Sequence, residues 1–544
     1  MKDNIISKIE LALKSLDFPI HKITVEIPRN PDHGDFSTNI AMTLVKVVKQ
    51  APQKIAQQII QQLFNDNNDN FFEDITLAGP GFINFKINPN FVNSQLKDIL
   101  VKSENYGKSE IGNGQTVLVE FVSANPTGPL TVGHGRGAIL GDTVGNILEW
   151  NGYTVQREYY FNDAGRQMRV LAQSVYARYL ETLGESFTFP EDGYQGEYIH
   201  DIARTIFQKH GDSLKDQSDS EIFKKTAESI IFEDIKKSLS NLGVIFDTFF
   251  NEHTLYDSGE IEEVLNVFRD KKLLYEKDNA TWFKGTAVGR NVDKVLIKST
   301  GEPTYRLPDI AYHQNKFRRN YDLIVDVFGA DHADTIPDVI AGIKELDFSD
   351  EKMKVLIHQF VTIMKDGVQV KMSTRKATFI TLDELSNDVG VDVVRYFFLM
   401  RGMNTHLNFD INLAKNQSDE NPVFYLQYAH ARVCNILKRA EAFGHQLNSA
   451  VDLSLLNEDI ENQLIRKLLE FPEVVTNSAE SLEPQPIANY LNDLSGFFHK
   501  FYAHHRVISD DNELTEARLL LTKSVKIVLA NGLKILGISA PERM

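Results

Sequence analysis

Hydrophobic and polar residues in the first hundred positions follow two different periods. Apolar residues at helical spacing predict an N-terminal helix on the stripe Ile5, Ile9, Leu13 and Leu16. Strict alternation predicts short strands at 23–27 and 83–87, and Pro52 marks the start of a second helix. Because both periods occur within a short stretch, we predict a small α+β domain, which we bound at residues 1–108.

From residue 109 the order changes to strand followed by helix. The continuous apolar run TVLVEFVS (116–123) is typical of a strand inside a parallel sheet. Further strands are expected at 155–161 and 322–329, and the helix after the first strand carries the stripe Leu140, Val144, Ile147 and Leu148. Residues from about 181 to 270 are richer in charge and are predicted to form an insertion. We therefore predict an α/β domain with a Rossmann-type parallel sheet over residues 109–420.

The last section of the chain is helical throughout. Apolar stripes at helical spacing run through 429–440, 487–501 and 521–529. Helices with such stripes bury them against one another, so we predict an all-α helix bundle over residues 421–544. The predicted fold class is therefore α/β, with an N-terminal α+β domain and a C-terminal all-α domain.

The chain has 544 residues, a formal net charge of −17 and one cysteine, Cys434. A single cysteine excludes an intrachain disulfide and cysteine-rich zinc sites, and it favours a reducing, cytoplasmic location. No apolar run is long enough to predict a membrane span, and the N-terminal helix lacks a signal-peptide cleavage site. The acidic balance argues against an unselective nucleic-acid coat but allows RNA binding through a local basic face.

The segment SANPTGPLTVGHGRGA (123–138) joins the first buried strand to its helix, which is where α/β folds bind ligands. Gly133, Gly135 and Gly137 allow a flat ring or a phosphate to approach the backbone, and the free N–H groups of the helix favour anions. His134 can donate a hydrogen bond to a phosphate oxygen. The alternative interpretation is a glycine- and proline-rich turn with an exposed histidine.

A second segment, VKMSTRKATFITLDEL (370–385), places Lys371, Arg375 and Lys376 beside the hydroxyl residues Ser373 and Thr374. A loop of this composition can close over a polyphosphate, because the cations neutralise charge and the hydroxyls fix position. Three cations in isolation also fit a solvated basic turn, so this segment carries weight only together with the first.

Together the two segments resemble the "HIGH" and "KMSKS" signatures of class I aminoacyl-tRNA synthetases, the second at 371–375. Longer strings resemble the arginyl-tRNA synthetase family, among them VEFVSANPTGPL (119–130), EYYFNDAGRQM (158–168), PTYRLPDIAYH (303–313) and FYLQYAHARVCNILKRA (424–440). IPRNPDHGDFSTNIAM (27–42) is similar to the N-terminal extra domain of that family. The helical section is similar to its anticodon-binding domain, so the resemblance covers nearly the whole chain.

The resemblance implies a two-step ligase reaction in protein synthesis. ATP and L-arginine form arginyl-adenylate and pyrophosphate, and the arginyl group then passes to the 3′ end of tRNA(Arg). By this resemblance the catalytic candidates are Thr131, His134, Lys371 and Arg375, and ATP contacts Gly133, Gly135, His134, Lys371 and Ser373. Mg²⁺ arrives with ATP, and neither a tightly bound cofactor nor a dedicated metal site is expected. The expected enzyme is a monomer with no membrane partner.

The planar guanidinium of arginine is matched best by carboxylates. Carried over position by position, the family's arginine pocket falls on Glu120, Ser123, Asn125, Tyr305, Asp309 and His332. Glu120 interrupts a buried apolar strand, which favours a functional role over that of an edge carboxylate. Tyr305 and Asp309 are four residues apart and would share a helix face, although both can also be structural.

The resemblance places tRNA contacts on two domains. In the helical domain, Tyr502, His505 and Arg506 are the candidates, because aromatic rings and arginine can stack unpaired bases. The nearby Phe498 and Phe501 fall on the apolar stripe and are predicted to be core. In the N-terminal domain, Phe36 and Asn39 are the candidates for the tRNA elbow, although such residues are more often packed or capping.

Two positions depart from the family signatures. Thr131 replaces the first His of "HIGH", and Thr374 replaces the second Lys of "KMSKS" and so removes a cation. We hypothesise that Arg375 or Lys376 supplies the missing charge, with Lys371 or Arg136 as further alternatives. Two other functions stay open: a class I synthetase for another amino acid, such as cysteine, and a non-catalytic tRNA-binding paralogue.

Overall fold

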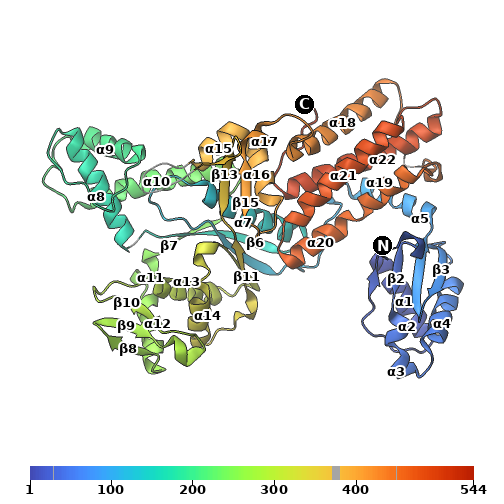
Figure 1. Ribbon diagram of the computed structural model, residues 1–544, viewed down its shortest axis with the longest axis horizontal. Helices are drawn as coiled ribbons and strands as arrows, with labels where there is room; N and C mark the ends of the chain where they lie inside the picture. Colours follow the sequence, from blue (N-terminus) through green and yellow to red (C-terminus); the bar gives the residue numbers. More distant parts are fainter. Residues whose placement is uncertain (29, 164, 371–379, 449) are drawn as a thin grey trace.

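The computed structural model describes residues 1–28, 30–163, 165–370, 380–448 and 450–544 (Figure 1). Its elements form an N-terminal unit, a central α/β unit on a parallel sheet, and a C-terminal bundle of long helices. The predicted fold class is confirmed. Most of the predicted phosphate loop, including Lys371, Ser373, Arg375 and Lys376, lies outside the described residues.

The N-terminal unit is a four-stranded antiparallel sheet covered by helices. The strand order is β1-β2-β4-β3, with the bounds Val25–Glu26, Phe36–Thr38, Phe82–Ile87 and Phe72–Ala78. The helices are α1 (Lys2–Ser15), α2 (Ile40–Thr43), α3 (Val45–Val48) and α4 (Pro52–Asn65), and α5 (Pro89–Ser94) and α6 (Leu96–Lys102) follow. The apolar stripe of α1 is buried at Ile5, Ile9 and Leu13, and α4 starts at Pro52 as predicted.

The central sheet has five parallel strands in the order β12-β11-β5-β6-β7. Their bounds are Met353–His358, Leu323–Gly329, Thr116–Phe121, Thr154–Phe161 and Thr248–Asn251. Helix α7 (Val132–Trp150) follows β5 and packs against β5, β6 and β11. The chain leaves β5 in one direction towards β7 and later returns on its other side as β11. The carboxyl ends of β5 and β11 therefore form the switch point at which open α/β sheets bind ligands.

Two groups of elements lie between the strands of this sheet. The helices α8 (Gly165–Thr182), α9 (Glu197–His210) and α10 (Glu221–Asn241) form a helical arm at the left of Figure 1. Strand β7 then rejoins the sheet, within the segment 181–270 for which the sequence predicts an insertion. The second group holds an antiparallel sheet of β8 (Leu274–Lys277), β9 (Ala280–Phe283) and β10 (Lys294–Ile297), with α11 (His253–Asp257), α12 (Glu260–Asp270), α13 (Arg306–Arg318) and α14 (Ile336–Glu345).

A small sheet of β13 (Val361–Lys365), β14 (Val368–Gln369) and β15 (Leu407–Asp410), with α15 (Leu382–Val389), α16 (Val391–Leu399) and α17 (Ile411–Lys415), leads to the bundle. The bundle comprises α18 (Pro422–Ala442), α19 (Asp459–Leu469), α20 (Phe471–Ser481), α21 (Gln485–His504) and α22 (Asn512–Ile535). Phe498 and Phe501 are fully buried, which confirms that they are core. Among the helices of the described ranges, none has the length and apolarity to cross a membrane.

Candidate active site

Two adjoining cavities open at the carboxyl ends of β5 and β11. The first, of about 840 Å³, is lined by residues between Glu120 and Asn125, by the start of α7 and by Asp309, and is called the Asp309 cavity. The second, of about 1040 Å³, reaches from the start of α7 to Arg166 and Arg169 of α8 and is called the Arg166 cavity. The two are continuous, because they share the lining residues Asn125, Thr131, His134, Asn162, Gln167, Glu252 and Tyr305.

His134 lies in the first turn of α7, with its ring held in one orientation. Its Nδ1 accepts a hydrogen bond from the backbone N–H of Thr131 at 3.2 Å, and Thr131 Oγ1 lies 3.3 Å from the same nitrogen. Because Nδ1 is an acceptor, the proton of the neutral ring lies on Nε2. Burial lowers the pKa of His134 and so favours this neutral form. His134 therefore offers one N–H donor to an anion in the cavities, and Thr131 orients it.

The glycines of the predicted phosphate-binding segment have different neighbours. Gly133 lines the Asp309 cavity, and a Cβ built on it would meet only Thr131 Oγ1, at 3.7 Å. A Cβ on Gly135 would lie 2.5 Å from Leu382 Cδ1 of α15, so Gly135 permits close packing between helices and borders neither cavity. The structure therefore lends no support to an ATP contact at Gly135, which stays a prediction. Gly137 lines the Asp309 cavity, and a Cβ built on it would lie 2.9 Å from His358 Nε2.

The six residues predicted for the arginine pocket lie around one cavity. The Asp309 cavity is lined by all of them: Glu120, Ser123, Asn125, Tyr305, Asp309 and His332. Tyr305 directly precedes α13, and its carbonyl accepts the N–H of Asp309 at 3.1 Å, so one helical turn separates the two side chains. The chain thus brings together residues from β5, from α13 and from the turn after β11.

The two predicted acidic residues of this cavity differ in their partners. The Glu120 carboxylate accepts a hydrogen bond from Ser123 Oγ at 2.8 Å and forms an ion pair with the buried Lys316. The Asp309 side chain has no hydrogen bond or ion pair to any described residue, and burial raises its pKa. A partly buried carboxylate without an ion-pair partner is costly, so Asp309 gains from a positively charged ligand in this cavity.

A third acid of the cavities, Glu252, was missed by the sequence analysis. It follows β7, lines both cavities and accepts a hydrogen bond from the Tyr160 hydroxyl at 2.8 Å. Burial raises the pKa of Glu252 to about 7. Its signal in the sequence is weak: an acid two residues after the aromatic pair Phe249 and Phe250, inside the segment predicted as an insertion.

Positive charge is missing from the wall of the Asp309 cavity. None of the described residues that line it is a lysine or an arginine. Arg136 is close in sequence, but its guanidinium donates to the backbone carbonyls of Gln359, Gly402 and Thr405 at 2.7–3.1 Å, so it is not free to bind a phosphate. Arg136 is therefore excluded as the replacement for the missing cation.

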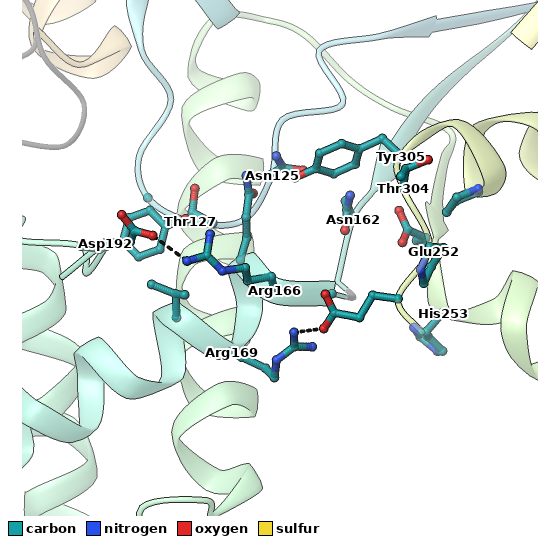
Figure 2. A pocket seen from close by; sticks show the side chains of 18 of the residues that line it. Asn125, Thr127, Asn162, Arg166, Arg169, Asp192, Glu252, His253, Thr304 and Tyr305 are labelled. Atoms are coloured by element: carbon teal, nitrogen blue, oxygen red, sulfur yellow. Dashed lines mark hydrogen bonds and ion pairs between the residues drawn. The ribbon is translucent and has the colours of Figure 1, made fainter. Parts of the chain in front are cut away.

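The Arg166 cavity, in contrast, has arginines in its wall, although acidic residues line it as well. Arg166 forms an ion pair with Asp192 at 2.5 Å, and Arg169 forms one with Glu302. Figure 2 shows the Arg166–Asp192 ion pair on the side of this cavity opposite Tyr305 and Glu252. Arginines with exposed side chains beside Tyr194, Tyr198 and Tyr256 make a wall that suits the phosphates and bases of a single-stranded nucleic acid.

In the helical bundle, the predicted RNA contacts lie beside a larger aromatic surface. Tyr502 is 39% exposed, and the Arg432 guanidinium lies 5.4 Å from its ring and 4.4 Å from that of Tyr428. Tyr428 and Tyr425 in turn contact His499, and we call these five side chains the α18/α21 face. His505 lies 3.3 Å from Arg518, and Arg506 is exposed.

The two candidates in the N-terminal unit differ in exposure. Phe36 is only 7% exposed, and in β2 it pairs with Phe85 of β4, which favours the packed alternative for Phe36 over an RNA contact. Asn39 is exposed at the start of α2, and its side chain makes no hydrogen bond to the helix. Within the described ranges no cluster of three His, Cys, Asp or Glu side chains could hold a metal ion.

Comparison with known proteins shows the same three units. The family model "Arginyl tRNA synthetase N terminal domain" matches residues 3–87, "tRNA synthetases class I (R), catalytic domain" matches 95–395, and "DALR anticodon binding domain" matches 426–544. The arginine–tRNA ligase of Desulfotalea psychrophila is 49% identical over 96% of this chain and 95% of its own. That of Salinibacter ruber is 46% identical over the full length of both chains.

Among solved structures, Thermus thermophilus arginyl-tRNA synthetase has a TM-score of 0.76 at 22% identity, covering 100% of both chains, which shows a shared fold. The matched models span all three units, and the relatives are nearly half identical over almost the entire chain. The chain belongs to the arginyl-tRNA synthetase family.

Proposed function

We propose that the two cavities together form the active site of an ATP-dependent arginine–tRNA ligase. The observation that carries this proposal is the partly buried Asp309 carboxylate, which has no ion-pair partner among the described residues, in a cavity whose other wall holds the neutral N–H donor of His134. A guanidinium supplies the missing positive charge, and the α-amino acid end then lies towards the start of α7, where phosphates are bound.

The reaction that follows has two displacements. An oxygen of the arginine carboxylate attacks the α-phosphorus of ATP, pyrophosphate leaves, and arginyl-adenylate forms. A ribose hydroxyl of the terminal tRNA nucleotide then attacks the arginyl carbonyl carbon, and AMP leaves. The protein contributes positioning and charge stabilisation, because no side chain needs to form a covalent bond.

Each group of the site has a place in this scheme. Asp309 and Glu120 bind the guanidinium, and Gly133 and Gly137 leave room for the nucleotide. His134 donates from Nε2 to a phosphate oxygen. The Arg166 cavity accepts the single-stranded end of the tRNA. Mg²⁺ enters bound to the phosphates of ATP. We further propose that the enzyme acts as a monomer in the cytoplasm; the single cysteine, which favours a reducing location, supports the cytoplasm.

The test of this function is aminoacylation of total tRNA with each of the twenty amino acids. We expect charging with arginine alone. Charging with another amino acid would identify a class I synthetase of different specificity. Binding of tRNA without any charging would identify a non-catalytic paralogue and overturn the proposal.

The variant Asp309→Asn should weaken arginine selectively. It removes a charged hydrogen bond in a buried site, which raises the KM for arginine about tenfold to a hundredfold. The KM for ATP should change less than about twofold, because no phosphate contacts this side chain. Steady-state aminoacylation with each substrate varied separately measures both constants.

Asp331→Asn is the matched control for this variant. Asp331 lines the same cavity, but its side chain is 65% exposed, so water screens its charge. An arginine KM that stays at the wild-type value in Asp309→Asn, or that rises equally in Asp331→Asn, would contradict the assignment of the guanidinium to Asp309.

The variant Tyr502→Ala should weaken tRNA binding through the α18/α21 face. Stacking of one base on an aromatic ring contributes about 1–3 kcal/mol, so the KM for tRNA should rise about tenfold. Phe443→Ala is the control, because Phe443 is 63% exposed and lies 5.5 Å from the guanidinium of Arg439 at the other end of α18. Equal effects of the two variants would count against a specific RNA-binding face.

A further inference from the structure

Three buried carboxylates lie side by side across the central sheet. Glu120 of β5 is paired in register with Asp326 of β11 on one side and with Glu158 of β6 on the other. Their exposed fractions are 2%, 0% and 0%. Like charges at directly opposed positions of neighbouring strands destabilise a sheet, so this row requires cations.

Helix α13 supplies these cations from a buried polar face. Asp309, Tyr312, His313 and Lys316 follow the spacing i, i+3, i+4 and i+7 and so lie on one side of the helix. Arg319, directly after the helix, binds Glu158 with two hydrogen bonds of 2.6 and 2.7 Å, and the Tyr312 hydroxyl donates to the same carboxylate. The carboxylate of Glu158 in β6 therefore has a cation and a hydrogen-bond donor as partners.

Lys316 joins the other two acids of the row. It has no exposed surface, and its ammonium binds Asp326 Oδ1 at 2.6 Å and Glu120 Oε2. Burial alone would lower the pKa of Lys316, but Asp326 and Glu120 outweigh burial and raise it, so the ammonium is charged. Ser123 Oγ holds the other oxygen of Glu120, which leaves the carboxylate fixed from two sides.

The ion-paired row reaches the cavity at Glu120, and Tyr312 and His313 of α13 line the cavity as well. Glu120 lines the Asp309 cavity, whereas Lys316 and Asp326 line neither cavity and lie behind it. His313 donates towards the Asp309 carbonyl, 2.7 Å away, and lies 3.2 Å from Asp326 Oδ2. The Lys316 ammonium thus serves both Glu120 and Asp326, so these two carboxylates share a single ammonium at the cavity wall.

We propose that Lys316 is a positioning residue for arginine recognition: held from behind by Asp326, its ammonium fixes the Glu120 carboxylate in the cavity wall for the guanidinium of the substrate. This inference rests on the proposed function of the same cavity. Lys316 acts through Glu120 and does not touch the substrate. The competing explanation is that Lys316 only neutralises the acid row and thereby stabilises the sheet.

Two variants of the full chain separate these explanations. Lys316→Met removes the ammonium and leaves Glu120 and Asp326 facing each other without a cation. Lys316→Met/Asp326→Asn removes one positive and one negative charge, so the net charge beside Glu120 equals that of the wild type. The bonds of the ammonium to Glu120 and Asp326 are then lost, while the charge balance of the row is kept. The measurements are the KM for arginine, the KM for ATP and the thermal unfolding midpoint.

We expect the arginine KM to rise about tenfold to a hundredfold in both variants, with the KM for ATP within about twofold of wild type. The unfolding midpoint should fall in Lys316→Met and recover in the double variant. A double variant that regains both the midpoint and the wild-type arginine KM would overturn the proposal in favour of charge balance. If Lys316→Met does not fold, the double variant alone decides.

Arg395→Met is the control for loss of a buried ion pair. Arg395 of α16 is 1% exposed, donates to Asp142 of α7 at 2.6 Å and lies outside both cavities. Arg395→Met should lower the unfolding midpoint without changing the arginine KM. A raised arginine KM in this variant would also contradict the proposal. A wild-type chain that fails to charge tRNA with arginine would instead refute the proposed function, which keeps the two failures distinct.

Discussion

Replacement of His134 by alanine should slow aminoacylation about a hundred- to a thousandfold in kcat, the effect of removing one preorganised donor from a developing anion. The backbone N–H of Thr131 occupies Nδ1, which leaves Nε2 as the only donor of the ring. The hydrogen bond strengthens as negative charge grows on the phosphate oxygens in the transition state. The KM values for arginine and ATP should therefore change far less than kcat.

The control for this variant is His200→Ala. His200 lies on α9 and lines neither cavity, so its replacement should leave kcat within about twofold of wild type. Pre-steady-state measurement of adenylate formation would place the defect of His134→Ala in the first step. A wild-type rate of adenylate formation in that variant would show that His134 does not stabilise the phosphates.

The variants Arg375→Ala and Lys376→Ala test which cation replaces the signature lysine at Thr374. The wall of the Asp309 cavity contributes no lysine or arginine among its described residues, and Arg136 is committed to backbone carbonyls. Stabilisation of phosphate charge is typically worth about 3–4 kcal/mol, so loss of the responsible cation should lower kcat by about two to three decades. We expect this fall in kcat first for Arg375→Ala, because the forked guanidinium of Arg375 can bind two phosphate oxygens at once.

Lys365→Ala, on the exposed end of β13, controls for loss of a nearby positive charge. It should leave kcat close to the wild-type value. Wild-type turnover in Arg375→Ala, in Lys376→Ala and in the double variant would refute compensation by either residue. Lys371, in the same segment, would then be the next candidate.

Local patterns were enough to predict the main elements, because the interactions that specify them are local. Pro52 fixes the start of α4, and the apolar run of β5 reflects a strand covered on both faces. The arginine pocket could be predicted only through the family resemblance. The residues it names lie on β5, α13 and the turn after β11, and no local period connects them.

Other features depend on tertiary contacts that no local pattern shows. Helix α7 is buried on nearly all sides, so periodicity cannot tell that Gly135 faces α15 while Gly137 faces the cavity. The four residues of β7 are only half-buried and fall in a charged segment. The sequence pattern therefore predicted neither this strand nor the role of Glu252, which follows it. In the sequence Lys316 resembles an ordinary surface lysine, because only the folded sheet brings Glu120 and Asp326 into contact with it.

The row of buried acids Glu120, Asp326 and Glu158 also determines when the central α/β unit can fold during synthesis of the chain. Glu120 and Lys316 are 196 residues apart in the chain, and Glu158 and Arg319 are 161 apart. At a synthesis rate of about 5–20 residues per second, about 10–40 seconds pass between the synthesis of each glutamate and that of the residue that pairs with it. Until then, burial would leave the carboxylates of Glu120 and Glu158 without cations, so strands β5 and β6 stay hydrated. The sheet can therefore be completed only after α13 has been synthesised, past the middle of the 544-residue chain, and a nascent chain released before α13 cannot keep a stable α/β unit.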